Sequence, residues 1–339
     1  MLTILFGGRS EERLVSVASA QNLARHFPEA RLVFWSPTGD LHVVEQAELA
    51  AHRDAFTTPF TARANSFAGS IEAGVEYLKG QTLILALHGT EGEDGSLQRI
   101  LEANRIAFTG TGARASALAF DKARTKEIAR HHHLPVAAEL MLEDLQLPAQ
   151  EEALRAFAKA HPRLVLKPRA QGSSVGLHIV KTPAELTAAI ASIQKTSLPY
   201  LAEPFLEGRE ITVGVYDTLD GKLAALPCSE VVVSDGRSFD YQGKYLGQGV
   251  VELTPAPLNG EEGLACQALA MQLHRAVGAY GYSRTDMILT ERGPVLLEIN
   301  TLPGLSKASF IPQQLSAAQI SMRDFFALQV KLAEARNRS

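Results

Sequence analysis

The chain has little cysteine and lacks the long apolar runs that mark membrane and secreted proteins. Only Cys228 and Cys266 occur among 339 residues, and because their spacing fits no metal or redox motif we interpret both as buried thiols. No apolar stretch approaches the roughly 20 residues of a membrane span. The N-terminus has neither the basic region nor the long apolar run of a signal peptide. These absences predict a cytoplasmic enzyme without a membrane partner.

The chain also lacks the basic clusters typical of nucleic-acid-binding proteins. Lysine and arginine total 33 against 37 acidic residues, which gives a net charge of −4 with both signs mixed. No aromatic-basic pattern appears, so we expect no nucleic-acid partner. A composition of 46% hydrophobic and 21% charged residues is that of an ordinary globular protein. At this length two or three domains are expected.

Strands alternate with helices in the first part of the chain. Strands are predicted at 2–6, 31–35 and 82–87, and a helix runs to about His26. This alternation indicates a parallel α/β layer. Residues 40–80 show no clear periodicity and are interpreted as a peripheral insertion.

Two further units follow, the second of mixed α and β content and the third rich in strands. Strands are predicted at 163–168, 177–180 and 200–203, several between 205 and 252, and helices at 121–132, from Pro183, at 261–277, from Pro312 and from Met322. The fold class is therefore α/β, with α+β character in the C-terminal half. We expect domains at 1–112, 113–203 and 204–339.

The segment 281–304 reads as a hairpin that gathers polar side chains on one face. With a three-residue loop between the strands, Asp286 lies opposite Glu298, and Arg284 lies opposite Asn300. Directly opposed Cβ atoms are about 4.5–5.5 Å apart, so these four side chains converge.

Two carboxylates this close require a proton or a cation between them. Oxygen ligands from Asp, Glu and Asn suit Mg²⁺, which completes its shell with phosphate oxygens and water. A solvated salt-bridge cluster is the alternative, but the apolar residues that flank the polar ones favour a buried sheet. The hairpin therefore predicts a metal–nucleotide site.

Two common phosphate-binding motifs do not apply. No Gly-Lys pair is followed by Ser or Thr, which excludes a Walker loop. Residues 110–115 match a dinucleotide fingerprint in letters, but the preceding strand is very short and no acidic residue follows at the required distance. We interpret that match as a turn into a helix.

The loop 167–176 is the stronger phosphate-binding candidate. A strand ends in Lys167, and glycines and serines follow. Glycines allow backbone N–H groups to approach phosphate oxygens, and the lysine supplies a charge. An ordinary surface loop is the alternative, although the lysine at the strand end favours a phosphate-binding lid.

These motifs together resemble the D-alanine–D-alanine ligase family of the ATP-grasp superfamily. The resemblance covers nearly the whole chain and rests on blocks at 7–16, 87–95, 109–112, 116–118, 121–122, 167–176, 240–241, 244–245, 298–301 and 303–304. It implies an ATP-grasp fold of three domains with the nucleotide held between the central and C-terminal domains. It also implies ligation of two D-alanines through an acyl phosphate, for peptidoglycan precursor synthesis, by a homodimer.

The resemblance also implies roles for individual residues in binding ATP. Lys122 and Lys167 would hold its phosphates, and Glu210 its ribose. The remaining nucleotide contacts would come from Ser174, Glu203, Pro204, Phe205, Leu206 and Lys244. Asp286, Glu298 and Asn300 would hold two Mg²⁺ ions, for which Mn²⁺ can substitute.

Other residues are implied to handle the amino acids. Glu12 would bind the ammonium of the first D-alanine, near Val15 and His88, and Ser309 would bind the second carboxylate. Arg284 and the N–H of Gly304 would stabilise the oxyanion. Ser173, Tyr245 and Glu12 would form a hydrogen-bonded trio that joins two lids, at 172–176 and 234–249.

Around the second-substrate pocket the sequence departs from the family pattern. Phe310 replaces an aliphatic residue, Lys307 lies nearby, and the stretch 246–252 is atypical. A D-Ala–D-Ser ligase, or another ATP-grasp carboxylate–amine ligase, therefore stays open. A non-catalytic nucleotide-binding protein and a dinucleotide oxidoreductase are the more distant alternatives.

Overall fold

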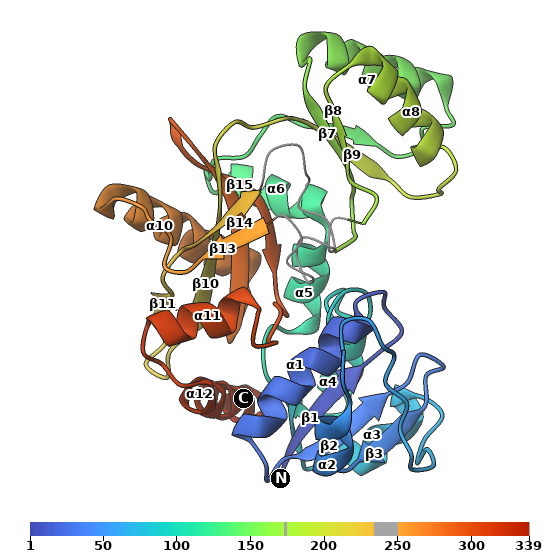
Figure 1. The fold of residues 1–339 in the computed structure, drawn as a ribbon, viewed down its shortest axis with the longest axis vertical. Coiled ribbons are helices and arrows are strands. Elements are labelled where there is room, and N and C mark those ends of the chain that lie inside the picture. The colour runs from blue at the N-terminus through green and yellow to red at the C-terminus, as the bar shows by residue number, and fades with distance from the viewer. Residues whose placement is uncertain (173–174, 234–249, 339) are drawn as a thin grey trace.

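The computed structural model describes residues 1–172, 175–233 and 250–338, which form three β-sheets with helices packed on them (Figure 1). The first sheet has the order β3-β2-β1-β4-β5. Its strands are β1 (Leu2–Gly7), β2 (Arg31–Trp35), β3 (Leu41–Val44), β4 (Thr82–Leu85) and β5 (Ala107–Phe108). All its pairings are parallel except that of the edge strand β3. The predicted parallel α/β layer is confirmed.

Residues 40–80 belong to this layer, so their interpretation as a peripheral insertion is wrong. The layer's helices are α1 (Arg13–His26), α2 (Gln46–Ala51), α3 (Ile71–Leu78) and α4 (Ser96–Ala103). Leu41, Leu49 and Leu78 are fully buried, so the segment completes the core. Its elements are too short for their periodicity to be visible in the sequence.

The second sheet is antiparallel and lies farthest from the N-terminal layer (Figure 1). It has the order β6-β9-β7-β8, and the bounds are β6 (Leu140–Leu142), β7 (Leu164–Pro168), β8 (His178–Val180) and β9 (Tyr200–Pro204). Helices α7 (Pro148–Ala160) and α8 (Pro183–Ile193) cover it. Thr182 and Glu185 form a capping box at the start of α8, as the Thr-Pro-Ala-Glu sequence favours.

The third sheet carries the hairpin and has the order β13-β12-β10-β14-β15, with β11 paired to β10. Its strands are β10 (Arg209–Asp217), β11 (Leu223–Ala225), β12 (Ser229–Val233), β13 (Val250–Leu253), β14 (Tyr282–Thr290) and β15 (Gly293–Asn300). Helix α10 (Gly260–Val277) packs on it, together with α5 (Ala113–Phe120) and α6 (Lys122–His131). Helix α11 (Phe310–Ala317) packs against β10. The division into domains at 1–112, 113–203 and 204–339 stays a prediction.

The hairpin has the predicted functional register but a different turn. Thr290 pairs with Gly293 rather than with Pro294, so the turn is one residue shorter than expected. A register shift between Asp286 and Met287 then inserts Leu297 as an extra residue in β15. The bulge restores the expected pairs, Asp286 with Glu298 and Arg284 with Asn300.

The last helix, α12 (Met322–Arg338), packs on the first sheet and also contacts the third, where Phe325 and Phe326 lie against the ring of Tyr282 on β14. Arg336 donates hydrogen bonds to the carbonyls of Phe108 and Gly110, and its guanidinium lies 4.2 Å from the centre of the Phe108 ring. At the other end of the helix, Arg323 bonds the carbonyl of His26 and pairs with Glu29. Helix α12 therefore links the C-terminal end of the chain to the N-terminal layer.

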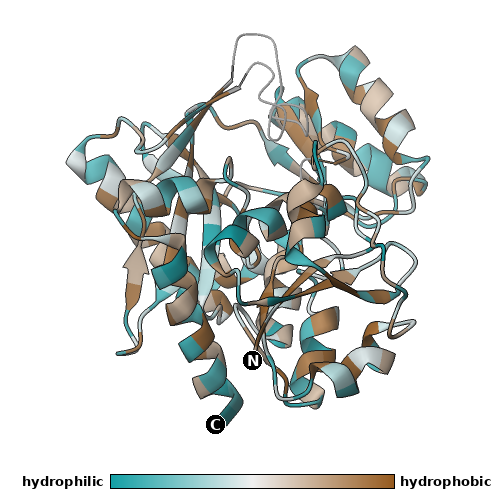
Figure 2. Cartoon of the chain, turned by 60° about the horizontal axis from the view of Figure 1, so that its bottom comes forward, coloured by the Kyte–Doolittle hydropathy of each residue, from teal (hydrophilic) through white to brown (hydrophobic). Residues whose placement is uncertain are grey.

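Apolar residues concentrate in the strands, whereas α12 alternates hydrophilic and hydrophobic residues along its length (Figure 2). Among the described residues, no helix is both long enough and apolar enough to cross a membrane.

Candidate active site

Two neighbouring cavities share one polar wall. The residues common to both linings are Lys122, Gln171, Glu210, Val231, Asp286 and Glu298. One cavity extends between the second and third sheets, and the other extends toward the N-terminal layer, where Glu12 and His88 line it. A group passed from one cavity to the other would cross at this wall.

Asp286 accepts hydrogen bonds from three neighbouring side chains of the wall. Arg284, which shares its face of β14, donates to both carboxylate oxygens at 2.9 and 2.6 Å. Thr212 on β10 donates at 2.5 Å, and Asn300 on β15 donates at 3.1 Å. Alternation along the strands places these side chains on one face of the sheet.

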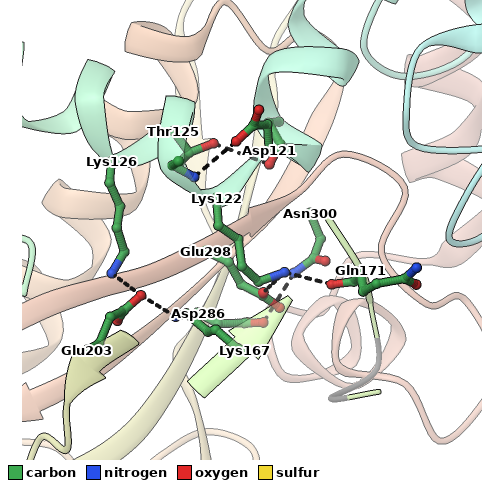
Figure 3. Close-up of polar contacts among 12 residues, drawn as sticks. Asp121, Lys122, Thr125, Lys126, Lys167, Gln171, Glu203, Asp286, Glu298 and Asn300 are labelled. Atoms are coloured by element: carbon green, nitrogen blue, oxygen red, sulfur yellow. Dashed lines mark hydrogen bonds and ion pairs between the residues drawn. The ribbon is translucent and has the colours of Figure 1, made fainter. Parts of the chain in front are cut away.

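Glu298 completes the wall and pairs with Lys122, which begins α6. The two side chains are 3.0 Å apart, and the ammonium of Lys122 also donates to the carbonyl of Gln171 at 2.6 Å (Figure 3). Donors thus contact both oxygens of Asp286, and the ammonium of Lys122 contacts Oε2 of Glu298.

The donor set of the wall decides whether it suits Mg²⁺. Within the described ranges, no group of three His, Cys, Asp or Glu side chains could hold a metal ion. The wall offers two carboxylates and the amide of Asn300 instead. That set fits Mg²⁺, because this ion usually keeps water and takes phosphate oxygens as its remaining ligands.

The cavity between the second and third sheets has residues that suit nucleotide binding. Lys167, at the end of β7, pairs with Glu203 of β9 at 2.9 Å. Pro204, Phe205 and Leu206 also line the cavity, as does Glu210 on β10. Its apolar lining consists of Val165, Leu177, Ile179, Ile288 and Leu297. Such a pocket suits a flat aromatic base with phosphates directed toward the wall.

The other cavity is bounded on the N-terminal side by His88 and Glu12. The ring of His88 donates from Nδ1 to the carbonyl of Leu302 at 2.8 Å and accepts at Nε2 from Ser19, also at 2.8 Å. Burial lowers the pKa of His88, which matches this neutral form. A Cβ at position 172 would lie 2.5 Å from Glu12 Oε2, so a larger residue there would displace the Glu12 carboxylate from its present position.

The C-terminal side of the same cavity is formed by residues 302–310. Gly304 lies against Ser309, whose hydroxyl is 2.8 Å from that of Ser306. The ring of Phe310 lies 5.7 Å from the guanidinium of Arg284. The exposed Lys307 is not among the described residues that line the cavity.

The structure therefore brings most of the expected site residues together. Val15 is fully buried on α1 and does not line the cavity in the described part of the chain. Ser173, Ser174, Lys244 and Tyr245 lie outside the described residues, as do part of the first expected lid and all of the second.

The sequence did not point to two cavity residues, Glu93 and Phe56, nor to Lys126, which lies behind the nucleotide cavity. Glu93 is buried, and its burial together with the Glu12 carboxylate raises the pKa of Glu93 to about 8. It lies within a family motif, which was the available signal. Phe56 comes from the segment interpreted as an insertion, and no signal marked it. Lys126 follows Lys122 by one helical turn and reaches Glu203.

Comparisons with known proteins identify the family of the chain. Family models described as D-ala D-ala ligase N-terminus and C-terminus match residues 1–111 and 128–330. A D-alanine–D-alanine ligase of Leptospira interrogans is 32% identical, with 99% of each chain covered. One of Ralstonia nicotianae is 34% identical, covering 95% of this chain and 87% of the relative.

Solved structures show the same fold. The VanG D-Ala:D-Ser ligase of Enterococcus faecalis has a TM-score of 0.82 at 25% identity, covering 98% of each chain. The D-alanine–D-alanine ligase of Coxiella burnetii has a TM-score of 0.80 at 24% identity, covering 99% of this chain and 96% of that one. The fold is that of an ATP-grasp ligase. The chain belongs to the D-alanine–D-alanine ligase family.

Proposed function

We propose that this protein joins two D-alanine molecules into D-alanyl-D-alanine with ATP, for peptidoglycan precursor synthesis. The observation that carries the proposal is the wall shared by the two cavities. An amide cannot form directly from a free carboxylate, because its oxygen is a poor leaving group. Phosphoryl transfer across the wall converts that oxygen into a phosphate leaving group.

In the nucleotide cavity, Lys122 and Lys167 bind the phosphates of ATP. Residues 203–206 bind the base through their backbone groups, and Glu210 binds the ribose. Asp286, Glu298 and Asn300 hold Mg²⁺, for which Mn²⁺ can substitute. When bound, the metal neutralises charge on the phosphates. On arrival of ATP, Lys122 exchanges Glu298 for a phosphate oxygen.

In the other cavity, Glu12 binds the ammonium of the first D-alanine and Ser309 the carboxylate of the second. Attack by the second amine on the acyl phosphate creates an oxyanion, which Arg284 and the N–H of Gly304 stabilise. Neutral His88 fixes the loop around Leu302 through its Nδ1 donor. Ser173 and Tyr245, with Glu12, close the lids that exclude water from the acyl phosphate.

A D-Ala–D-Ser ligase is the second candidate, favoured by Phe310 beside Arg284 at the end where Ser309 lies. We place the protein in the cytoplasm, where its substrates are made, and propose a homodimer.

Incubation with ATP, Mg²⁺ and D-alanine tests the proposal. We expect release of inorganic phosphate together with a dipeptide of the expected mass. D-Serine offered with D-alanine separates the two candidates by product mass. Turnover with L-amino acids only would replace the proposal with a different carboxylate–amine ligase, and binding of ATP without turnover of any amino acid would refute the catalytic function.

A further inference from the structure

Lys126 lies at the junction of the second and third sheets, behind the nucleotide cavity. It is carried by α6, which packs with α10 and β15, but its side chain points to the second sheet (Figure 3). The side chain is fully buried. A buried ammonium is costly unless charged partners surround it.

Two carboxylates and a second ammonium face it. Lys126 Nζ lies 2.5 Å from Glu203 Oε1 and 3.9 Å from Glu139 Oε2. Lys167 Nζ lies 2.9 Å from the same oxygen of Glu203. Behind them, Arg130 pairs with Glu139 at 2.5 Å.

The cluster carries an excess of positive charge. Three cations face two carboxylates, and of the three only Lys167 lines the nucleotide cavity among the described residues. Repulsion from Lys126 opposes a closer contact between Lys167 and Glu203. The excess positive charge therefore lies at Lys167 on the cavity side, where a bound anion would neutralise it.

We propose that Lys126 is a positioning residue for nucleotide binding: by sharing Glu203 it keeps Lys167 available to the phosphates of ATP. This rests on the proposed function, since it assumes that the cavity holds ATP. Without Lys126, the carboxylate of Glu203 pairs with Lys167 alone. Binding of ATP then requires that this buried ion pair be broken first.

The test compares Lys126→Met with the double variant Lys126→Met/Glu203→Gln, using Lys159→Met, an exposed lysine of α7, as the matched control. ATP affinity is measured by calorimetry, and the KM values for ATP and D-alanine by phosphate release. We expect the single variant to weaken ATP binding roughly tenfold while the KM for D-alanine stays unchanged. The double variant should recover most of the loss, because Lys167 is again unpaired with a carboxylate.

A purely structural role predicts the opposite pattern. Both KM values and kcat would then worsen together, and the double variant would be no better than the single one. Either result overturns the proposal.

The pH profile supplies a second readout. Burial, with the neighbouring Lys167, lowers the pKa of Lys126 to about 8 against the pull of Glu203 and Glu139. The ATP affinity of the wild type should therefore fall as pH rises through about 8, more steeply than that of Lys126→Met. Identical profiles would contradict the proposal. Calorimetry with ATP alone keeps these tests valid even if the protein ligates no D-alanine.

Discussion

Asp286 and Glu298 lie opposite each other on β14 and β15 only because β15 contains one residue more than a regular ladder allows. The short turn at Glu291 and Arg292 would otherwise set Asp286 against Leu297. Leu296, opposite Met287 on the turn side of the bulge, is fully buried, and the bulge turns Glu298 into the wall. Bulges commonly re-aim side chains beside active sites.

The acidic pair should govern the metal requirement. Glu298→Gln keeps the shape but removes a charge, and we expect turnover to fall by roughly 10²-fold or more, with a higher Mg²⁺ concentration for half-maximal activity. Glu291→Gln, in the exposed turn of the same hairpin, is the matched control and should behave as wild type. Chelation of Mg²⁺ should abolish wild-type turnover. An unchanged Mg²⁺ titration for Glu298→Gln would remove Glu298 from the metal site.

Phe56 and Phe310 should restrict the size of the second amino acid. Both line the amino-acid cavity, and the turn carrying Phe56 is fixed by buried neighbours, Ala55 and Phe60, and by Gln21, which bonds the carbonyl of His52 at 2.7 Å. We expect Phe56→Ala and Phe310→Leu to admit larger D-amino acids, measured as kcat/KM over a panel read by product mass.

The size of that effect is limited, because one methylene is worth only about 1–3 kcal/mol of discrimination. The KM for ATP should not change in either variant. A panel with the wild-type ranking in both variants would show that these rings do not bound the second subsite.

Glu93 should make stability depend on pH. Its pKa is raised to about 8 in the folded protein from an ordinary value of 4.5, so the folded state binds the extra proton between these values. Its contribution to stability is present below about 4.5 and is lost as pH rises through about 8.

Glu93→Gln cannot titrate, so its melting temperature relative to wild type should rise between pH 5 and pH 8 on the order of a few degrees. Thermal unfolding at several pH values measures the difference. A constant difference would mean that Glu93 titrates normally. Glu72→Gln, on the exposed surface of α3, serves as control.

Asp121 should stabilise the start of α6, the helix that carries Lys122. Its carboxylate accepts the N–H groups of Ala123 and Arg124 at 3.1 and 3.2 Å and pairs with Arg169 at 2.8 Å. Loss of such a cap costs about 0.5–2 kcal/mol, so Asp121→Ala should lower the free energy of unfolding by that amount. Glu127→Ala, exposed on the same helix, should change it by less than about 0.5 kcal/mol in denaturant titrations.

The sequence predicted the features that depend on local periodicity. Alternation along 281–304 was enough to place Asp286, Glu298 and Asn300 on one face, although the assumed turn was wrong and the unseen bulge compensated for it. Phe56 could not be predicted, because its approach to the cavity depends on tertiary anchors such as Gln21. Lys126 looked like any polar residue of a helix, since its burial arises only when a second sheet packs on α6.

The contacts of helix α12 determine which parts of the molecule are able to move. Arg336 and Arg323 fasten the C-terminal helix to the first layer at both of its ends. The N-terminal and C-terminal sides of the amino-acid cavity are therefore held in a fixed position relative to each other. We expect the second sheet to move as a hinged unit. The nucleotide product would then leave when this sheet opens, while the amino-acid cavity keeps its shape.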